Sequence, residues 1–132
     1  MGCIEDESID LIVTSPPYPM IEMWDDIMTS QNPKIGSALS DNPSDAFEMM
    51  HQELDKAWRE CYRLLKDGGM MCINIGDATR TINKEFQLYN NHTRIVNACI
   101  SLGFSPTSTL KTFSLNFQSV FAPLSFQLVE YQ

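Results

Sequence analysis

Residues that build metal centres are few in this chain. Its 132 residues include four cysteines and two histidines, and no two cysteines stand in a Cys-x-x-Cys spacing. Cys61 and Cys72 fall on the apolar faces of their segments, where small buried thiols are common. With so few potential ligands, the sequence argues against a zinc site.

Long apolar segments are also lacking. No hydrophobic run approaches the roughly 18 residues that cross a membrane, and the N-terminus has no basic and apolar leader. We therefore expect a cytoplasmic protein without a membrane partner. A hydrophobic content of 43% and a charged content of 20% are globular values, and a chain of 132 residues can bury one modest core.

Positive charge is scarce. Nine lysines and arginines stand against 17 acidic residues, which gives a net charge of −8, and the basic residues are scattered along the chain. Proteins that neutralise nucleic-acid phosphates usually present a basic face. The composition therefore argues against a large phosphate-binding surface within these residues.

One segment carries most of the chemical information. Thr14–Tyr18 reads Thr-Ser-Pro-Pro-Tyr and follows the apolar run Ile9–Val13. Its two prolines fix two φ angles near about −65° and remove two backbone donors, so a strand must end there. The result is a stiff extended corner with the Ser15 hydroxyl on one side and the Tyr18 ring on the other. In open α/β sheets the carboxyl ends of strands are where ligands bind, which makes this corner a candidate site.

A second strand follows a long amphipathic helix. Ser44 can cap this helix, Asp45 adds favourable charge to its first turn, and the pair Gly68-Gly69 is expected to end it. The next residues, Met70–Ile75, form an apolar run typical of a buried strand. This β–α–β order predicts two parallel strands with the crossover helix on a face of the sheet. Apolar residues at intervals of three and four define the buried stripe of the helix: Phe47, Met50, Leu54, Ala57, Trp58, Cys61, Leu64 and Leu65.

Three further segments bear on the site. Asp77 follows the second strand, where it could be a site residue or could cap the following turn. A second helix is expected at about Leu88–Leu102, with Gly103 ending it. Pro19–Pro43 is a long connection beside the corner, a length that is usually functional or mobile. It could equally be a partly helical surface segment with Trp24 packed on the sheet.

The segment Leu11–Tyr18 resembles the catalytic motif of the DNA amino-methyltransferases, which use S-adenosylmethionine to methylate an exocyclic amine of cytosine or adenine. Members carry Asp, Asn or Ser, then Pro-Pro, then an aromatic residue; the Ser version after Thr is typical of the cytosine-N4 branch. The resemblance implies that the Ser15 hydroxyl and the Pro16 carbonyl accept hydrogen bonds from the target amine. Tyr18 would stack on the base after it has swung out of the duplex. The implied catalytic residues are Ser15, Pro16, Pro17 and Tyr18.

The resemblance continues through Ala46–Arg80, where Leu-Lys-Asp-Gly-Gly and Asn-Ile-Gly-Asp look like the region after that motif, and it covers roughly Ile4–Phe104. It implies an α/β fold, a partial Rossmann-like S-adenosylmethionine-dependent methyltransferase domain with a mostly parallel sheet. Residues 1–132 would form one partial domain, the catalytic half, with one or two C-terminal strands. Residues 105–132 form a divergent tail in which the expected Trp-Arg-Lys type of strand is not found.

The resemblance also implies partners and ligand contacts. S-adenosylmethionine would be the cofactor, touched only at its edge by Thr14 and Ser15. DNA would be the substrate, contacted by Tyr18, Trp24 and Lys34. Half a sheet exposes strand edges and apolar surface, so a second chain or another copy of this chain is expected to complete it. A cognate restriction endonuclease is a further possible partner.

One element of such enzymes is absent from the sequence. The glycine-rich turn that lets backbone approach the cofactor, typically Phe-x-Gly-x-Gly, does not occur, and neither does an acidic residue placed for the ribose. Three functions therefore stay open. The chain could belong to a cytosine-N4 DNA methyltransferase of a restriction-modification system, to an adenine-N6 enzyme, or to an inactive remnant or subunit. In the active enzymes, the methyl group passes directly to the amine without a metal or a covalent enzyme intermediate.

Overall fold

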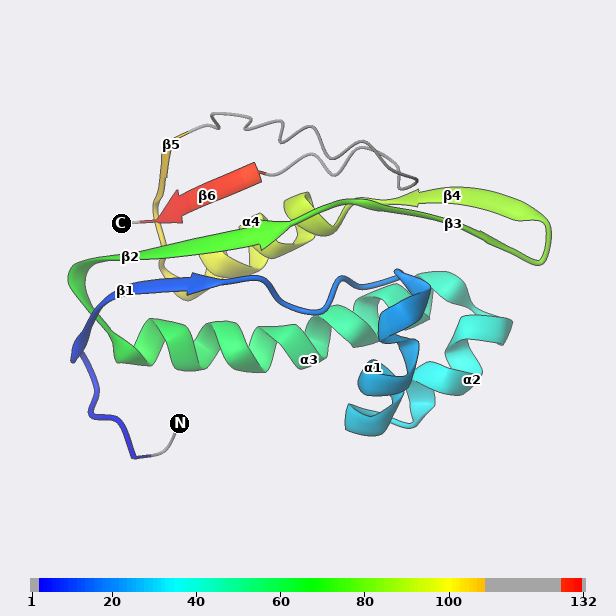
Figure 1. Ribbon diagram of the computed structural model, residues 1–132, viewed down its shortest axis with the longest axis horizontal. Coiled ribbons are helices and arrows are strands. Elements are labelled where there is room, and N and C mark those ends of the chain that lie inside the picture. Colours follow the sequence, from blue (N-terminus) through cyan, green and yellow to red (C-terminus); the bar gives the residue numbers. More distant parts are fainter. Residues whose placement is uncertain (1–2, 109–126, 132) are drawn as a thin grey trace.

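The computed structural model of the protein describes residues 3–108 and 127–131. A four-stranded sheet, in the order β1-β2-β6-β5, lies against helices, and a separate two-stranded hairpin projects from it (Figure 1). The strands of the sheet are β1 (Ile9–Thr14), β2 (Leu65–Ile75), β5 (Pro106–Ser108) and β6 (Gln127–Tyr131). The helices are η1 (Glu22–Trp24), α1 (Asp25–Gln31), α2 (Lys34–Asp41), α3 (Pro43–Leu64) and α4 (Asn91–Leu102), and the hairpin strands are β3 (Ala78–Ile82) and β4 (Glu85–Tyr89).

Strands β1 and β2 run parallel, as the β–α–β pattern predicts. Val13 pairs with Cys72 and Thr14 pairs with Ile73, so the two strands end at the same edge of the sheet. Strand β6 runs antiparallel to both β2 and β5, which leaves β1, β2 and β5 pointing the same way. The expected α/β fold with a parallel β1–β2 pair and C-terminal strands is therefore confirmed, while both pairs made by β6 are antiparallel. Residues 109–126 of the predicted divergent tail lie outside the described residues.

Both long helices pack on one face of this sheet. Alternate residues of β2, Met71, Ile73 and Ile75, are fully buried in the core that α3 and α4 share. Arg94 of α4 joins the helices, since its guanidinium contacts Glu48 (2.7 Å) and Asp55 (2.8 Å) on α3. The opposite face of β1 is different. Leu11 is 53% exposed and Val13 is 70% exposed, so this strand leaves apolar side chains uncovered. No described helix is long and apolar enough to cross a bilayer.

Helix α3 begins two residues before the predicted start. Asn42, not Ser44, is its N-cap: the Asn42 side chain accepts a hydrogen bond from the Asp45 N–H and donates one to the Asp45 carboxylate. Pro43 occupies the first helical turn, where its missing N–H costs no hydrogen bond. The prediction of Ser44 was therefore wrong, because Pro43 can begin a helix as well as close a loop. Asp45 lies in the first turn, as expected.

We expect Asn42→Ala to lower the free energy of unfolding by about 1 kcal/mol, because it leaves an end N–H of α3 without its side-chain acceptor. Urea denaturation measures the change. The matched control is Ser44→Ala, which removes the hydroxyl next to the cap and should shift stability by less than about 0.5 kcal/mol. A larger loss from Ser44→Ala than from Asn42→Ala would show that the cap is misassigned.

The glycine pair was expected to end α3, and this prediction was wrong. The helix ends at Leu64, and its last carbonyls are capped by the segment before β1, since the N–H groups of Glu7 and Ser8 donate to Arg63 and Leu64. Gly68, with a φ of 77°, lies in a bulge of β2. Here residues 66–69 loop out between the Ile9–Leu65 and Leu11–Met70 pairs. The last carbonyls of α3 are thus capped by backbone from a distant segment, and not by a glycine that follows the helix.

Residues 78–89 form a hairpin that the sequence analysis did not predict, and α4 begins at Asn91 rather than near Leu88. The tight turn falls at Asn83 and Lys84, which both have positive φ. On the outward face of the hairpin Phe86 and Leu88 are 72% and 58% exposed. In the sequence, Leu88 extends the apolar pattern of the following helix although its side chain faces solvent in the hairpin. This explains why the start of α4 was predicted too early. Gly103, at a φ of 114°, ends α4 as predicted.

The segment 19–43 is mostly helical, as one of the two readings offered for it predicts. η1, α1 and α2 follow one another and bury Met28, Ile35 and Ala38 against the core. The Asn32 side chain accepts a hydrogen bond from the Lys34 N–H (3.1 Å) and so starts α2. These short helices stand at the same end of the molecule as the hairpin, beyond the carboxyl end of β1 (Figure 1).

Candidate active site

The Ser-Pro-Pro-Tyr corner lies at the carboxyl end of β1, directly after Thr14. Ser15 is exposed, Pro16 is buried and Pro17 is half-buried, so the prolines anchor the corner while the hydroxyl stays accessible. Tyr18 is half-buried and packs against the edge of the core. The corner thus holds an exposed hydroxyl and a half-buried aromatic ring on a stiff backbone at the end of β1.

A strained turn follows the corner. The Ile21 N–H donates to the Tyr18 carbonyl (3.2 Å), which places Pro19 and Met20 at the centre of the turn. Met20 has a φ of 67°, a conformation that costs a residue with a side chain about 1–3 kcal/mol. Two features hold it there. Its side chain is buried in the core, being 1% exposed, and its N–H donates to the Met50 sulfur (3.4 Å).

Asn91, the first residue of α4, ties this turn to the end of β2. Its side-chain amide donates to the Pro19 carbonyl (2.9 Å) and to the Gly76 carbonyl (3.0 Å), and the residue is fully buried. The two chain segments that leave β1 and β2 are therefore held by one side chain. The neighbouring Asp77 accepts a hydrogen bond from the His92 N–H (3.0 Å), so it caps α4, which is closer to the capping role weighed for it than to a site role.

His51 of α3 completes this buried group. Its Nε2 lies 2.9 Å from the Asn91 Oδ1. Since both amide hydrogens of Asn91 go to carbonyls, the amide oxygen must accept, and Nε2 of His51 carries the proton. Burial lowers the pKa of His51 from 6.5 to about 4, against the opposing effect of the Asn91 hydrogen bond. The ring is therefore neutral at pH 7, and its Nδ1 has no hydrogen-bond partner within the described part of the chain.

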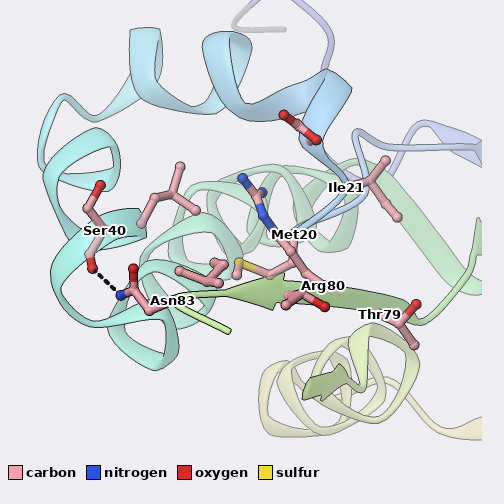
Figure 2. Close-up of a pocket in the computed structure, with 10 residues that line it drawn as sticks. Met20, Ile21, Ser40, Thr79, Arg80 and Asn83 are labelled. Atoms are coloured by element: carbon pink, nitrogen blue, oxygen red, sulfur yellow. Dashed lines mark hydrogen bonds between the residues drawn. The ribbon is translucent and has the colours of Figure 1, made fainter. Parts of the chain in front are cut away.

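A pocket of about 470 Å³ opens next to the corner, between the turn after it, α2 and the hairpin (Figure 2). The Asn83 side chain donates to the Ser40 carbonyl (3.1 Å) and so ties the hairpin to α2. Arg80, at the pocket wall, makes a two-pronged ion pair with Asp25 (2.8 and 2.6 Å). The residues around the pocket are Met20, Ile21, Glu22, Leu39, Ser40, Thr79, Arg80, Thr81, Ile82 and Asn83.

The residues predicted to contact the substrate differ in their exposure to solvent. Lys34 is exposed at the start of α2, and Trp24 is half-buried between η1 and α1. Lys34, and Lys84 in the hairpin turn, make no ion pair among the described residues. Most other described cations do have one: Lys56, Arg63, Lys66, Arg80 and Arg94 all contact carboxylates. The free positive charge at this end of the molecule is therefore small.

The described glycines do not form the cofactor turn. Gly68 and Gly69 lie at the amino end of β2, far along the strand from the corner. Gly76 is buried at the carboxyl end, and its carbonyl is already bonded by Asn91. Thr14 and Ser15, the predicted edge contacts of the cofactor, lie at the end of β1, where Thr14 is half-buried and Ser15 is exposed. The same described part of the chain holds no cluster of three or more His, Cys, Asp or Glu side chains that could bind a metal.

Comparison with known proteins gives a consistent assignment. A family model described as DNA methylase, for N6 and N4 enzymes, matches residues 9–122. The type II methyltransferase M.MthZI of Methanothermobacter thermautotrophicus is 47% identical over 106 residues, which are 79% of this chain and 30% of that protein. The type II methyltransferase M.MjaI of Methanocaldococcus jannaschii is 46% identical over 116 residues, covering 79% of this chain and 38% of that protein. The chain thus spans about a third of the length of these relatives.

Solved structures show the same fold. TTHA0409 of Thermus thermophilus, a putative DNA modification methylase crystallised with S-adenosyl-L-methionine, superposes with a TM-score of 0.68 at 22% identity. The superposition covers 99% of this chain and 50% of that one. A structure of the same protein described without the ligand gives a TM-score of 0.68 over 48% of its length. The α/β fold expected from the sequence is therefore confirmed.

Proposed function

Because the chain belongs to the DNA methylase family whose model spans residues 9–122, we propose that it carries the base-binding part of an S-adenosylmethionine-dependent DNA amino-methyltransferase. The observation that carries the proposal is the corner: Ser15 is exposed on a backbone stiffened by two prolines at the carboxyl end of a parallel strand. The similar fold of TTHA0409, a protein crystallised with S-adenosyl-L-methionine, supports the choice of cofactor.

In this proposal the corner acts on the exocyclic amine of a base that has left the duplex. The amine nitrogen is a weak nucleophile because its lone pair is delocalised into the ring. The Ser15 hydroxyl and the Pro16 carbonyl accept hydrogen bonds from its two N–H groups and so favour the pyramidal geometry of the transition state. Tyr18 stacks on the base, and Pro17 keeps the ring and the hydroxyl at a fixed separation. The cofactor supplies the methyl group.

We assign the target as cytosine N4. The Ser-Pro-Pro-Tyr sequence after Thr14 favours this branch over adenine N6. The two relatives, both type II methyltransferases, support a role in a restriction-modification system, in which a cognate endonuclease cuts the unmethylated site. The product of methylation decides between the two bases.

DNA would be bound mainly by other surfaces of the complete enzyme. Tyr18 and Trp24 contribute aromatic contacts beside the corner, and Lys34 contributes a free cation. Lys84 adds a second cation from the hairpin turn, which the Asn83–Ser40 hydrogen bond holds near the end of α2. With a net charge of −8 the chain alone is expected to bind DNA weakly.

The rest of the domain would join the chain at β1. Strand β1 pairs with β2 along one edge, and no described strand pairs with its other edge. Leu11 and Val13 are exposed on the face of β1 that α3 and α4 do not cover. A segment or second chain that adds a strand at the free edge would satisfy its backbone groups, and a helix packed on the open face would cover these side chains. In this proposal residues 1–132 form one partial domain, and the joining segment brings the glycine-rich turn.

The decisive experiment compares the 132-residue protein with a fusion that adds the part of M.MjaI outside the matched 116 residues. Calorimetry should detect little or no S-adenosylmethionine binding by the unfused protein and clear binding by the fusion. Mass spectrometry of nucleosides from incubated DNA should then find N4-methylcytosine with the fusion. N6-methyladenine would place the chain in the adenine branch. A folded, cofactor-binding fusion that methylates neither base would make the chain an inactive remnant.

A further inference from the structure

The buried group behind the corner has a role that the corner residues themselves do not explain. We propose that Asn91 is a positioning residue of the Ser-Pro-Pro-Tyr corner, and that His51 holds the Asn91 side chain in place by donating to its amide oxygen. The inference rests on the proposed function for its catalytic consequence, but not for its structural content. Neither residue is near the corner in sequence; α3 and α4 bring them there.

The first argument is the place where Asn91 acts. The carbonyl that it holds belongs to Pro19, the residue directly after Tyr18 and inside the strained turn. The other carbonyl, at Gly76, directly follows β2. A left-handed Met20 persists only where its surroundings impose it, and such strain is concentrated at functional sites. Asn91 is one of those constraints, because its hydrogen bond fixes the preceding peptide.

The second argument is that the amide of Asn91 has only one workable direction. Rotated by half a turn, its oxygen would face the oxygens of Pro19 and Gly76, and its hydrogens would face His51. The two carbonyls can only accept, so they fix the direction of the amide, and the neutral His51 ring matches it by donating its Nε2–H to the amide oxygen at 2.9 Å. His51 is fully buried, and Arg94, Asp55 and Glu48 are the charged groups that act on it. The pair is thus a buried polar network that specifies one arrangement of the corner.

Hydrogen exchange of the full 132-residue protein tests the structural content. The Ile21 amide reports on the turn, and the Ile73 amide reports on the sheet. Asn91→Ala should speed the exchange of Ile21 by about tenfold or more relative to Ile73, because the turn opens locally. The matched control is Asn90→Ala: Asn90 caps the same helix by accepting from the Thr93 N–H (2.9 Å), but it makes no hydrogen bond to the corner. Its effect on Ile21 and Ile73 should be equal.

Variants of His51 test the same proposal if the Asn91→Ala protein fails to fold. His51→Leu should also speed hydrogen exchange of the Ile21 amide. His51→Gln, which retains a side-chain N–H, should leave that exchange as slow as in the unaltered protein. Unchanged exchange of Ile21 in a folded Asn91→Ala protein would overturn the proposal, as would equal responses to His51→Leu and His51→Gln.

Catalysis supplies the second readout. In the methylating fusion, Asn91→Ala should lower the single-turnover rate by about 10²-fold while the Kd for DNA changes little, because a misplaced acceptor slows the chemical step. A loss confined to the Kd would contradict a positioning role. If the unaltered fusion methylates no DNA, the proposed function fails, and the exchange experiment still decides whether Asn91 holds the corner.

Discussion

Replacing Ser15 with alanine in the methylating fusion is expected to reduce the single-turnover rate by roughly 10²–10³-fold, or about 3–4 kcal/mol. The change removes one acceptor aimed at the target amine and leaves both prolines in place. Ser15 is exposed and Pro16 is buried, so the backbone of the corner should keep its course without the hydroxyl. The measurement is the rate of N4-methylcytosine formation at saturating DNA and cofactor.

Two variants isolate this effect. Ser8→Ala removes a hydroxyl at the opposite end of β1, where it bonds the Glu5 carbonyl, and should leave the rate unchanged. Tyr18→Ala should instead weaken capture of the flipped base, by about 1–3 kcal/mol per stacked base, and so raise the Kd for DNA. A rate that does not respond to Ser15→Ala would remove the hydroxyl from the mechanism.

The parts of the site that could be predicted are those set by local chemistry. Two adjacent prolines end a strand whatever surrounds them, so Thr14–Tyr18 was placed correctly at the end of β1. The apolar run Met70–Ile75 and the helix before it define a parallel pair, and a parallel pair has its carboxyl ends at one edge. The same reasoning predicted Asp77 at the carboxyl end of the second strand, and Asp77 lies two residues beyond Ile75, where β2 ends.

The parts that could not be predicted depend on contacts between distant segments. His51 falls on the buried stripe of α3, but its spacing is that of a core residue and indicates nothing about Asn91, 40 residues away. Asn91 itself follows another asparagine at a helix start, where either could be a cap. The sequence predicts a helix end at Gly68-Gly69, but α3 ends at Leu64, because the backbone N–H groups of Glu7 and Ser8, before β1, cap its last carbonyls.

Acidification should weaken the fold through His51. The pKa of His51 is lowered by burial to about 4 in the folded protein, from 6.5 in the unfolded chain. Between these values the unfolded chain binds more protons, so the free energy of unfolding falls as the pH falls from about 6.5 to about 4. The difference between the two pKa values corresponds to a loss of about 3 kcal/mol. The charge of Arg94 also lowers the pKa of His51, while the charges of Asp55 and Glu48 raise it.

Urea denaturation at intervals between about pH 7 and about pH 4 measures this loss. His51→Gln cannot take up the proton and should flatten the stability profile over that range, while His92→Gln, which removes the other imidazole, serves as the control. Glu48 has a pKa below 4.5, held down by the Arg94 guanidinium, so its own contribution is lost at lower pH than most of the His51 effect. An equally steep profile in His51→Gln would show that His51 does not stay neutral in the fold. Faster exchange of the Ile21 amide in parallel with this loss would link protonation of His51 to the corner, because a charged His51 is costly to bury even while its Nε2–H still donates to Asn91.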